Sequence, residues 1–149
     1  MSSLAWLMPA GSRDRAIGNY HQEQTIIAIV DDDESVCHAI KGLVRSLGME
    51  ADTFASGQEF IGFIEAMPSR RFNCVILDVQ MPGLNGLDVQ ERLKRLGNWF
   101  PIIFLTAHDE VSVRERALAA GAVAFLRKPF AAELLIKTLR AAVKLDANA

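Results

Sequence analysis

Short runs in which almost every residue is apolar recur along this chain, and they constrain its fold more than any other feature. The four clearest are TIIAIV at 25–30, CVILD at 74–78, PIIFLT at 101–106 and AVAFL at 122–126. A strand with one face in water alternates apolar and polar residues, whereas a strand buried on both faces is apolar throughout. The runs therefore predict an α/β fold, in which a parallel sheet lies between two layers of helices.

Helical patterns separate these runs, because apolar residues between them recur at intervals of three and four. The expected helices cover 36–47, 84–96, 110–120 and the segment from Phe130 onward. The segment EADTF at 50–54 is interpreted as a further, short strand. Ser56, followed three residues later by Glu59, predicts a capping box that begins a fifth helix ending near Ala66.

We expect one domain, at residues 25–145, between two short flanking segments. Residues 1–24 lack periodicity and are expected to be a disordered N-terminal extension, and residues 146–149 a C-terminal tail. The alternative for the first segment is a docking peptide that uses its apolar residues Leu4, Trp6, Leu7 and Met8.

Composition excludes several classes of protein. The 16 basic and 18 acidic residues give a net charge of −2, so we expect no direct binding of nucleic acid. No apolar run reaches the roughly 18 residues of a membrane span. Cys37 and Cys74 lie far apart in apolar or helical patterns, which predicts buried free thiols in a reducing compartment. We therefore expect a cytoplasmic protein without a membrane contact.

Polar residues end the predicted strands or follow within two residues. These residues are Asp31, Asp32, Asp78, Thr106 and Lys128. The carboxyl ends of parallel strands meet at one edge of a sheet, where ligands bind, so we expect the five side chains to lie together. Three close carboxylates repel one another, and Mg²⁺ binds such oxygens together with phosphate oxygens. Asp78 is then placed to attack phosphorus and form an acyl phosphate, while Lys128 offsets charge.

The motifs VDDDE, LDVQMPGLNG, FLTA and FLRKPF follow one another in this order at appropriate separations. With them, the chain from about Thr25 to Leu145 resembles the receiver (CheY-like) domain of two-component response regulators. It is similar to receivers of the LuxR/FixJ-type group, which precede LuxR-type DNA-binding domains. The resemblance implies a flavodoxin-like, doubly wound (βα)5 three-layer sandwich, whose five-stranded parallel sheet has the order 2-1-3-4-5.

The resemblance also implies a phosphoacceptor and a metal site. Asp78 is the phosphoacceptor, and it holds Mg²⁺ together with Asp32, with Asp31 mainly through water, and with the backbone carbonyl of Gln80. Mn²⁺ could substitute for Mg²⁺. The side chains of Gln80 and His108 are expected to flank the path of the water that hydrolyses the acyl phosphate, and so to tune dephosphorylation.

A second group of residues is implied to respond to the phosphoryl group. Thr106 is the switch hydroxyl, Lys128 contacts the phosphoryl oxygens, and the Lys128–Pro129 peptide is expected to be cis. Phe125 holds the position of the switch aromatic. Many members of the family have tyrosine there, and phenylalanine lacks the hydroxyl that would form a hydrogen bond.

The function implied is that of a switch in a phosphorelay. A histidine kinase or a phosphotransfer protein donates the phosphoryl group to Asp78, and Thr106 and Phe125 then repack the surface of the fourth helix, fifth strand and fifth helix. The chain is expected to catalyse only its own phosphorylation and dephosphorylation, and is otherwise no enzyme. It is expected to be a monomer or a phosphorylation-dependent homodimer, with a downstream protein partner that the sequence does not identify.

Three alternatives accompany this interpretation. Since no helix-turn-helix pattern follows the last helix, the chain is expected to act alone, or else to be the receiver fragment of a DNA-binding transcription regulator. A phosphatase of the haloacid dehalogenase type also uses a strand-end aspartate with Mg²⁺, but it carries an acid two residues later, where this chain has Gln80. Regulation without phosphate is disfavoured, because the acid, threonine and lysine set is complete.

Overall fold

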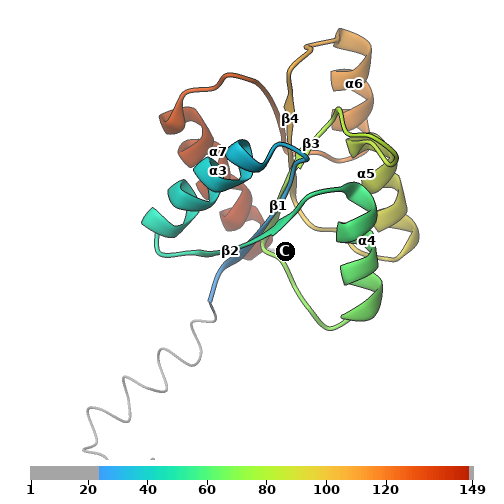
Figure 1. Cartoon of the computed structure of the whole chain (residues 1–149), viewed down its shortest axis with the longest axis horizontal. Coiled ribbons are helices and arrows are strands. Elements are labelled where there is room, and N and C mark those ends of the chain that lie inside the picture. The colour runs from blue at the N-terminus through green and yellow to red at the C-terminus, as the bar shows by residue number, and fades with distance from the viewer. Residues whose placement is uncertain (1–23, 148–149) are drawn as a thin grey trace, which may run out of the picture.

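Five parallel strands form one sheet in the computed structural model, which describes residues 24–147 (Figure 1). The strands are β1 (Ile26–Val30), β2 (Glu50–Phe54), β3 (Cys74–Asp78), β4 (Ile102–Thr106) and β5 (Ala124–Arg127). The helices are α3 (Glu34–Ser46), α4 (Gly57–Ala66), α5 (Gly86–Arg95), α6 (Val111–Ala119) and α7 (Ala132–Ala147). The sheet order β2-β1-β3-β4-β5 confirms the predicted fold class and strand order.

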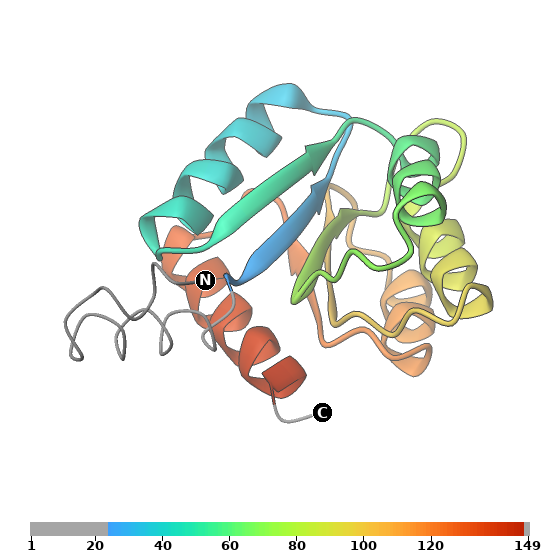
Figure 2. The same cartoon turned by 90° about the horizontal axis from the view of Figure 1, so that it is seen from below.

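The central strands are buried on both faces, as their composition predicts. Every residue of β3 and β4 is buried, and successive side chains of β3 point alternately into two apolar cores. Helices α3 and α7 cover one core, and α4, α5 and α6 cover the other (Figure 2). Because all five strands run in the same direction, their carboxyl ends lie at one edge of the sheet.

The prediction for the last strand was wrong in its bounds and in its burial. We expected a buried strand at 122–126, but β5 begins at Ala124 and ends at the exposed Arg127. The amide of Ala122 still donates to the carbonyl of Ala117, 3.0 Å away, and so belongs to the turn that ends α6. Strand β5 pairs with β4 alone, and an edge strand is less covered than a central one.

Side chains cap the helices, although not always as predicted. Asp33 caps α3, and the hydroxyl of Ser56 accepts a hydrogen bond from the amide of Glu59 at the start of α4. Only this half of the predicted capping box is formed among the described residues. A complete box begins α5 instead, where Asn85 and Asp88 each accept from the backbone amide of the other. The sequence analysis did not identify this box.

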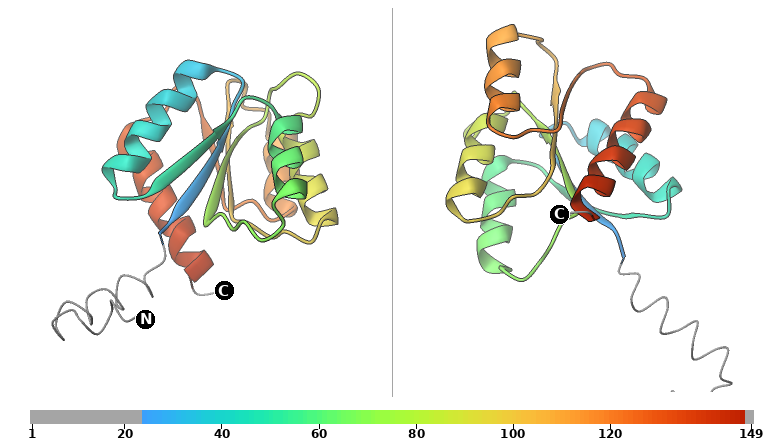
Figure 3. Two further views of the ribbon diagram at one scale, coloured as in Figure 1. Left: turned by 60° about the horizontal axis from the view of Figure 1, so that its bottom comes forward. Right: turned by 180° about the vertical axis from the view of Figure 1, so that it is seen from behind.

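The last turn of α7 is tied to the amino-terminal ends of β1 and β3. The helix continues to Ala147, beyond the expected start of a tail at 146. The Asp146 carboxylate accepts from the side-chain amide of Asn73 at 3.0 Å, and the other end of that amide accepts from the backbone of Ile26 at 2.9 Å. Figure 3 shows the last turn of α7 beside the start of β1.

The predicted extension, apart from Gln24, lies outside the described residues, as do residues 148–149. Within residues 24–147, no helix has the length and apolar character needed to cross a membrane.

Phe72 lies at the centre of an aromatic cluster that the sequence patterns did not predict. It precedes β3, outside any predicted element, yet it is fully buried. The rings around it, with centroids 5.9 to 6.2 Å from its own, are those of Phe54, Phe60, Phe63 and Phe100. These rings join the edge strand β2 and helix α4 to the loop before β4.

We predict that Phe72→Ala lowers the free energy of unfolding by about 3–5 kcal/mol, because it removes a buried ring and leaves a cavity. Urea denaturation followed by circular dichroism measures the change. Trp99→Ala is the control, since the Trp99 side chain is 74% exposed, and we expect a change below about 1 kcal/mol. Equal losses in the two variants would contradict this assignment of the core.

The two free thiols give a second prediction. Cys37 and Cys74 are both buried, and burial raises the pKa of Cys37 to about 11 and that of Cys74 further still. Since the thiolate is the reactive form, both should react with Ellman's reagent at mildly alkaline pH on the order of 100-fold more slowly in the native protein than in denaturant. A native thiol that reacts at the unfolded rate would contradict the burial.

Candidate functional site

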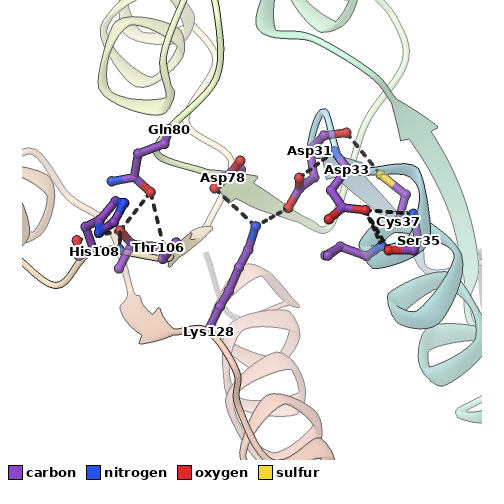
Figure 4. A network of polar contacts seen from close by, with 11 residues as sticks. Asp31, Asp33, Ser35, Cys37, Asp78, Gln80, Thr106, His108 and Lys128 are labelled. Carbon is purple, nitrogen blue, oxygen red and sulfur yellow. Dashed lines mark hydrogen bonds and ion pairs between the residues drawn. The ribbon is translucent and has the colours of Figure 1, made fainter.

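Four of the predicted polar residues meet at the carboxyl edge of the sheet, and Figure 4 shows three of them, Asp31, Asp78 and Lys128. Asp31 and Asp32 follow β1, Asp78 is the last residue of β3, and Lys128 follows β5. Parallel pairing of β1 with β3, and of β3 with β5 through β4, brings these positions together although almost 100 residues separate the first from the last. The convergence expected from the topology is therefore present for these residues.

The ammonium group of Lys128 lies between two buried carboxylates. It donates to Oδ2 of Asp31 at 2.8 Å and to Oδ1 of Asp78 at 3.4 Å. Asp31 is 1% exposed and Asp78 is 3% exposed, so little water solvates either group. The second oxygen of Asp31 accepts from the backbone amide of Asp33 at 2.9 Å. The peptide bond between Lys128 and Pro129 is cis.

The cluster holds more negative than positive charge. Burial, followed by the charge of Asp31, raises the pKa of the Asp78 carboxyl to about 6, although Lys128 opposes the shift. Burial by itself lowers the pKa of Lys128, but the hydrogen bond to Asp31 and the charge of Asp78 outweigh it and leave the pKa raised. A single ammonium group thus compensates the carboxylates only in part.

The donor set fits a hard divalent cation. One carboxylate oxygen from each of Asp31, Asp32 and Asp78 lies within 4.8 Å of the others. Asp32 is exposed, which leaves one side of the group open to solvent. Mg²⁺ prefers oxygen ligands and retains several waters, so an open cluster of carboxylates suits it. The backbone carbonyl of Gln80, two residues after Asp78, stays the predicted further ligand.

Thr106 lies at the same edge, but its hydroxyl is engaged elsewhere. The hydroxyl donates to the carbonyl oxygen of His108 at 2.7 Å, with Oε1 of Gln80 as a second acceptor at 3.0 Å. It accepts from the backbone amide of His108 at 3.1 Å. The structure therefore separates the predicted residues into two groups, one around Lys128 and one around Thr106 (Figure 4). His108 contributes backbone atoms to the second group.

Phe125 lies on the edge strand, near the group around Thr106 in the sheet. Its side chain is half-buried and packs against Phe104 on the neighbouring strand, with ring centroids 6.0 Å apart. The two residues are paired in the register of β4 and β5, two pairs before the last one, which joins Thr106 to Arg127. An aromatic ring that is only partly enclosed has space to change its position.

Gly86 is a residue of the site that the sequence analysis missed. It is buried in the first turn of α5, where a Cβ atom would lie 2.5 Å from the carbonyl oxygen of Asp78 and 2.9 Å from the Phe104 ring. Glycine thus lets α5 approach the backbone of Asp78 closely. The motif PGLNG contained a signal, because glycine inside a helix is unfavourable unless close packing requires it.

Comparison with known proteins agrees with this geometry. The family model described as the response regulator receiver domain matches residues 27–140. The chain belongs to this family. The recognition made from its motifs is thereby confirmed, and the chain is a receiver domain of the kind found in two-component systems.

Curated relatives of this receiver are longer proteins. The response regulator protein TodT of Pseudomonas putida is 43% identical over 121 residues, which are 81% of this chain and 52% of TodT. Nodulation protein W of Bradyrhizobium diazoefficiens is 39% identical over 134 residues, which are 89% of this chain and 58% of that protein. The receiver thus spans little more than half the length of these relatives.

Solved structures of similar size share its fold. A response regulator receiver protein from Burkholderia phymatum is 55% identical, with a TM-score of 0.72 over 81% of this chain and 96% of its own. The chemotaxis protein CheY4 of Vibrio cholerae is 28% identical, with a TM-score of 0.71 over 80% and 99%. Both support the flavodoxin-like architecture of the receiver.

We predict that Gly86→Ala lowers the free energy of unfolding by about 1–3 kcal/mol, because the added methyl group overlaps the backbone at Asp78. Urea denaturation measures the change. Gly62→Ala is a matched control in α4: nothing lies within 4 Å of its Cβ position, and alanine favours the helix by about 0.5–1 kcal/mol. The two substitutions should have opposite signs, and a stabilising Gly86→Ala would contradict the close approach.

Proposed function

We propose that this receiver is a phosphoacceptor in a His–Asp phosphorelay, and that Asp78 accepts the phosphoryl group from a histidine kinase or a phosphotransfer protein. The observation that carries the proposal is the buried Asp78 carboxylate at the end of β3, with the Lys128 ammonium 3.4 Å away and two further carboxylates beside it. Family membership supports the same assignment.

The chemistry follows from the groups around Asp78. A carboxylate oxygen of Asp78 forms a bond to phosphorus while the bond between phosphorus and the donor's imidazole nitrogen breaks, and the electron pair stays on that nitrogen. Lys128 stabilises the oxygens of the incoming group and favours the ionised form of Asp78. Asp31, Asp32 and Asp78, with the carbonyl of Gln80, would hold Mg²⁺, which would neutralise further phosphoryl charge.

Water then removes the phosphoryl group and restores the carboxylate. The receiver in this proposal catalyses only its own phosphorylation and dephosphorylation, and has no other substrate. The side chains of Gln80 and His108 are both exposed at this edge and could meet water approaching Asp78. Their identities are proposed to set the rate of hydrolysis.

The output surface is proposed to be α6, β5 and α7. Thr106 is buried and is the last residue of β4, so a turn of its hydroxyl toward a phosphoryl group on Asp78 would pull the loop that leads into α6. Helix α6 is suited to move, because Glu110 at its N-cap makes no side-chain capping bond. Phe125 would then fill the space that Thr106 leaves.

The longer relatives favour transcription control as the output. FixJ of Bradyrhizobium diazoefficiens, named a transcriptional regulatory protein, is 35% identical over 118 residues, which are 56% of its length. We propose that the receiver acts in such a pathway through contact with another protein or domain, as a monomer or as a homodimer formed on phosphorylation. The cytoplasm is the proposed location.

Phosphorylation by acetyl phosphate, followed by intact mass spectrometry, tests the function. We expect the wild type to gain one phosphoryl group with Mg²⁺ and at least about tenfold less when EDTA removes the metal. Asp78→Asn should gain none. Asp33→Asn is the matched control, because Asp33 is an exposed N-cap residue in the same loop as the metal ligands, and it should be labelled like the wild type.

Two results would overturn the proposal. One is an unlabelled wild type under conditions that label another receiver. The other is equal labelling of Asp78→Asn and the wild type, which would place the phosphoryl group elsewhere.

A further inference from the structure

The side chain of Gln80 binds the backbone and side chain of the loop that follows β4. Its Oε1 atom accepts from the Thr106 hydroxyl at 3.0 Å and from the Ala107 amide at 3.2 Å. Gln80 follows β3, so these bonds join two loops that leave neighbouring strands (Figure 4). The amide oxygen is thus part of the environment of Thr106.

The Thr106 hydroxyl cannot donate to a further acceptor without losing one of its present bonds. A hydroxyl carries a single proton to donate, and here the proton faces both Gln80 and the carbonyl of His108. The same oxygen accepts from the His108 amide. Thr106 is fully buried, so water does not replace a lost partner easily. A turn of the hydroxyl toward Asp78 must break its bond with Gln80.

We propose that Gln80 is a positioning residue. It holds the Thr106 hydroxyl in its present position, as in the unphosphorylated protein, and so opposes the turn of this hydroxyl toward Asp78. This inference rests on the proposed function, and it assigns Gln80 a role in the equilibrium between two arrangements, apart from any role in hydrolysis. A turn of the hydroxyl toward Asp78 would break the bond to Gln80, so removal of this bond favours the turned arrangement. One neutral hydrogen bond changes such an equilibrium by about 2- to 10-fold.

The two roles of Gln80 differ in what they change. A residue that only flanks the water path alters the rate of phosphoryl loss and leaves the affinity for an unreactive phosphoryl analogue unchanged. A residue that holds Thr106 alters this affinity, because the analogue binds tighter when more of the free protein already has the competent arrangement. Beryllofluoride, with saturating Mg²⁺, is such an analogue for an aspartyl phosphate.

The first measurement is the dissociation constant of beryllofluoride for the wild type, Gln80→Met, Thr106→Val and the double variant. Methionine keeps the length of the side chain but has no comparable acceptor. We expect Gln80→Met to bind about 2- to 10-fold tighter than the wild type. In the Thr106→Val background the Gln80 substitution should change the affinity much less, because the hydroxyl is absent and only the bond of Gln80 to the Ala107 amide remains.

The second measurement is the NMR chemical shift of the Thr106 methyl group in variants without the analogue. In the free protein, the methyl resonance of Thr106 in Gln80→Met should move toward its position in the analogue-bound wild type. Gln80→Glu retains Oε1 as an acceptor and should leave the resonance at the wild-type position. A structural disturbance that leaves Thr106 in its present arrangement would not move the resonance from the position in the free wild type toward that in the analogue-bound wild type.

The outcomes separate the inference from the proposed function. If the wild type binds the analogue and Gln80→Met binds it equally or more weakly, the inference is wrong and the function stands. If Gln80→Met has the same effect with and without the Thr106 hydroxyl, Gln80 acts on the analogue directly and the inference is again wrong. If the wild type binds no analogue, the proposed function fails and the inference fails with it.

Discussion

The placement of one ammonium group between two buried carboxylates is the constraint on which the rest of the site depends. Lys128 meets Asp31 and Asp78 only because a parallel sheet ends three of its strands at the same edge. The apolar runs that bury the sheet also remove water from these acids, which raises the pKa of Asp78 and leaves a deficit of positive charge. Core composition and site chemistry are therefore linked: the same burial that stabilises the fold favours a divalent cation at its edge, and that cation would offset the charge of a phosphoryl group.

The site contains two clusters of polar residues, one at the ends of β1, β3 and β5 and the other at the ends of β3 and β4, and no hydrogen bond among the described residues joins them. One surrounds Lys128 and responds to charge, whereas the other surrounds Thr106 and is held by hydrogen bonds between loops. A switch needs such a separation. A change of charge at Asp78 can alter the protein surface only if a second part of the site, here the cluster around Thr106, has two arrangements. The edge position of β5 and the half-buried ring of Phe125 leave room for the second arrangement on the side of α6.

Sequence reasoning predicted the features that periodicity and topology determine. Uniform apolar runs identified the buried strands, and parallel pairing then placed Asp31, Asp78 and Lys128 together, as found. It failed where a contact depends on side-chain rotamers or on loop paths, which no spacing rule contains. The bond between Gln80 and the Thr106 loop belongs to this class, as do the burial of the loop residue Phe72 and the shifted start of β5.

The central claim is that the carboxylate ending β3 accepts the phosphoryl group, and reductive trapping tests it most directly. Borohydride converts an aspartyl phosphate to homoserine, and peptide mass spectrometry then identifies the residue that carried it. After treatment with acetyl phosphate and Mg²⁺, we predict homoserine at position 78 and at no other aspartate. Homoserine at position 31 or 32, or its absence from a protein that has gained phosphate, would contradict the assignment of Asp78.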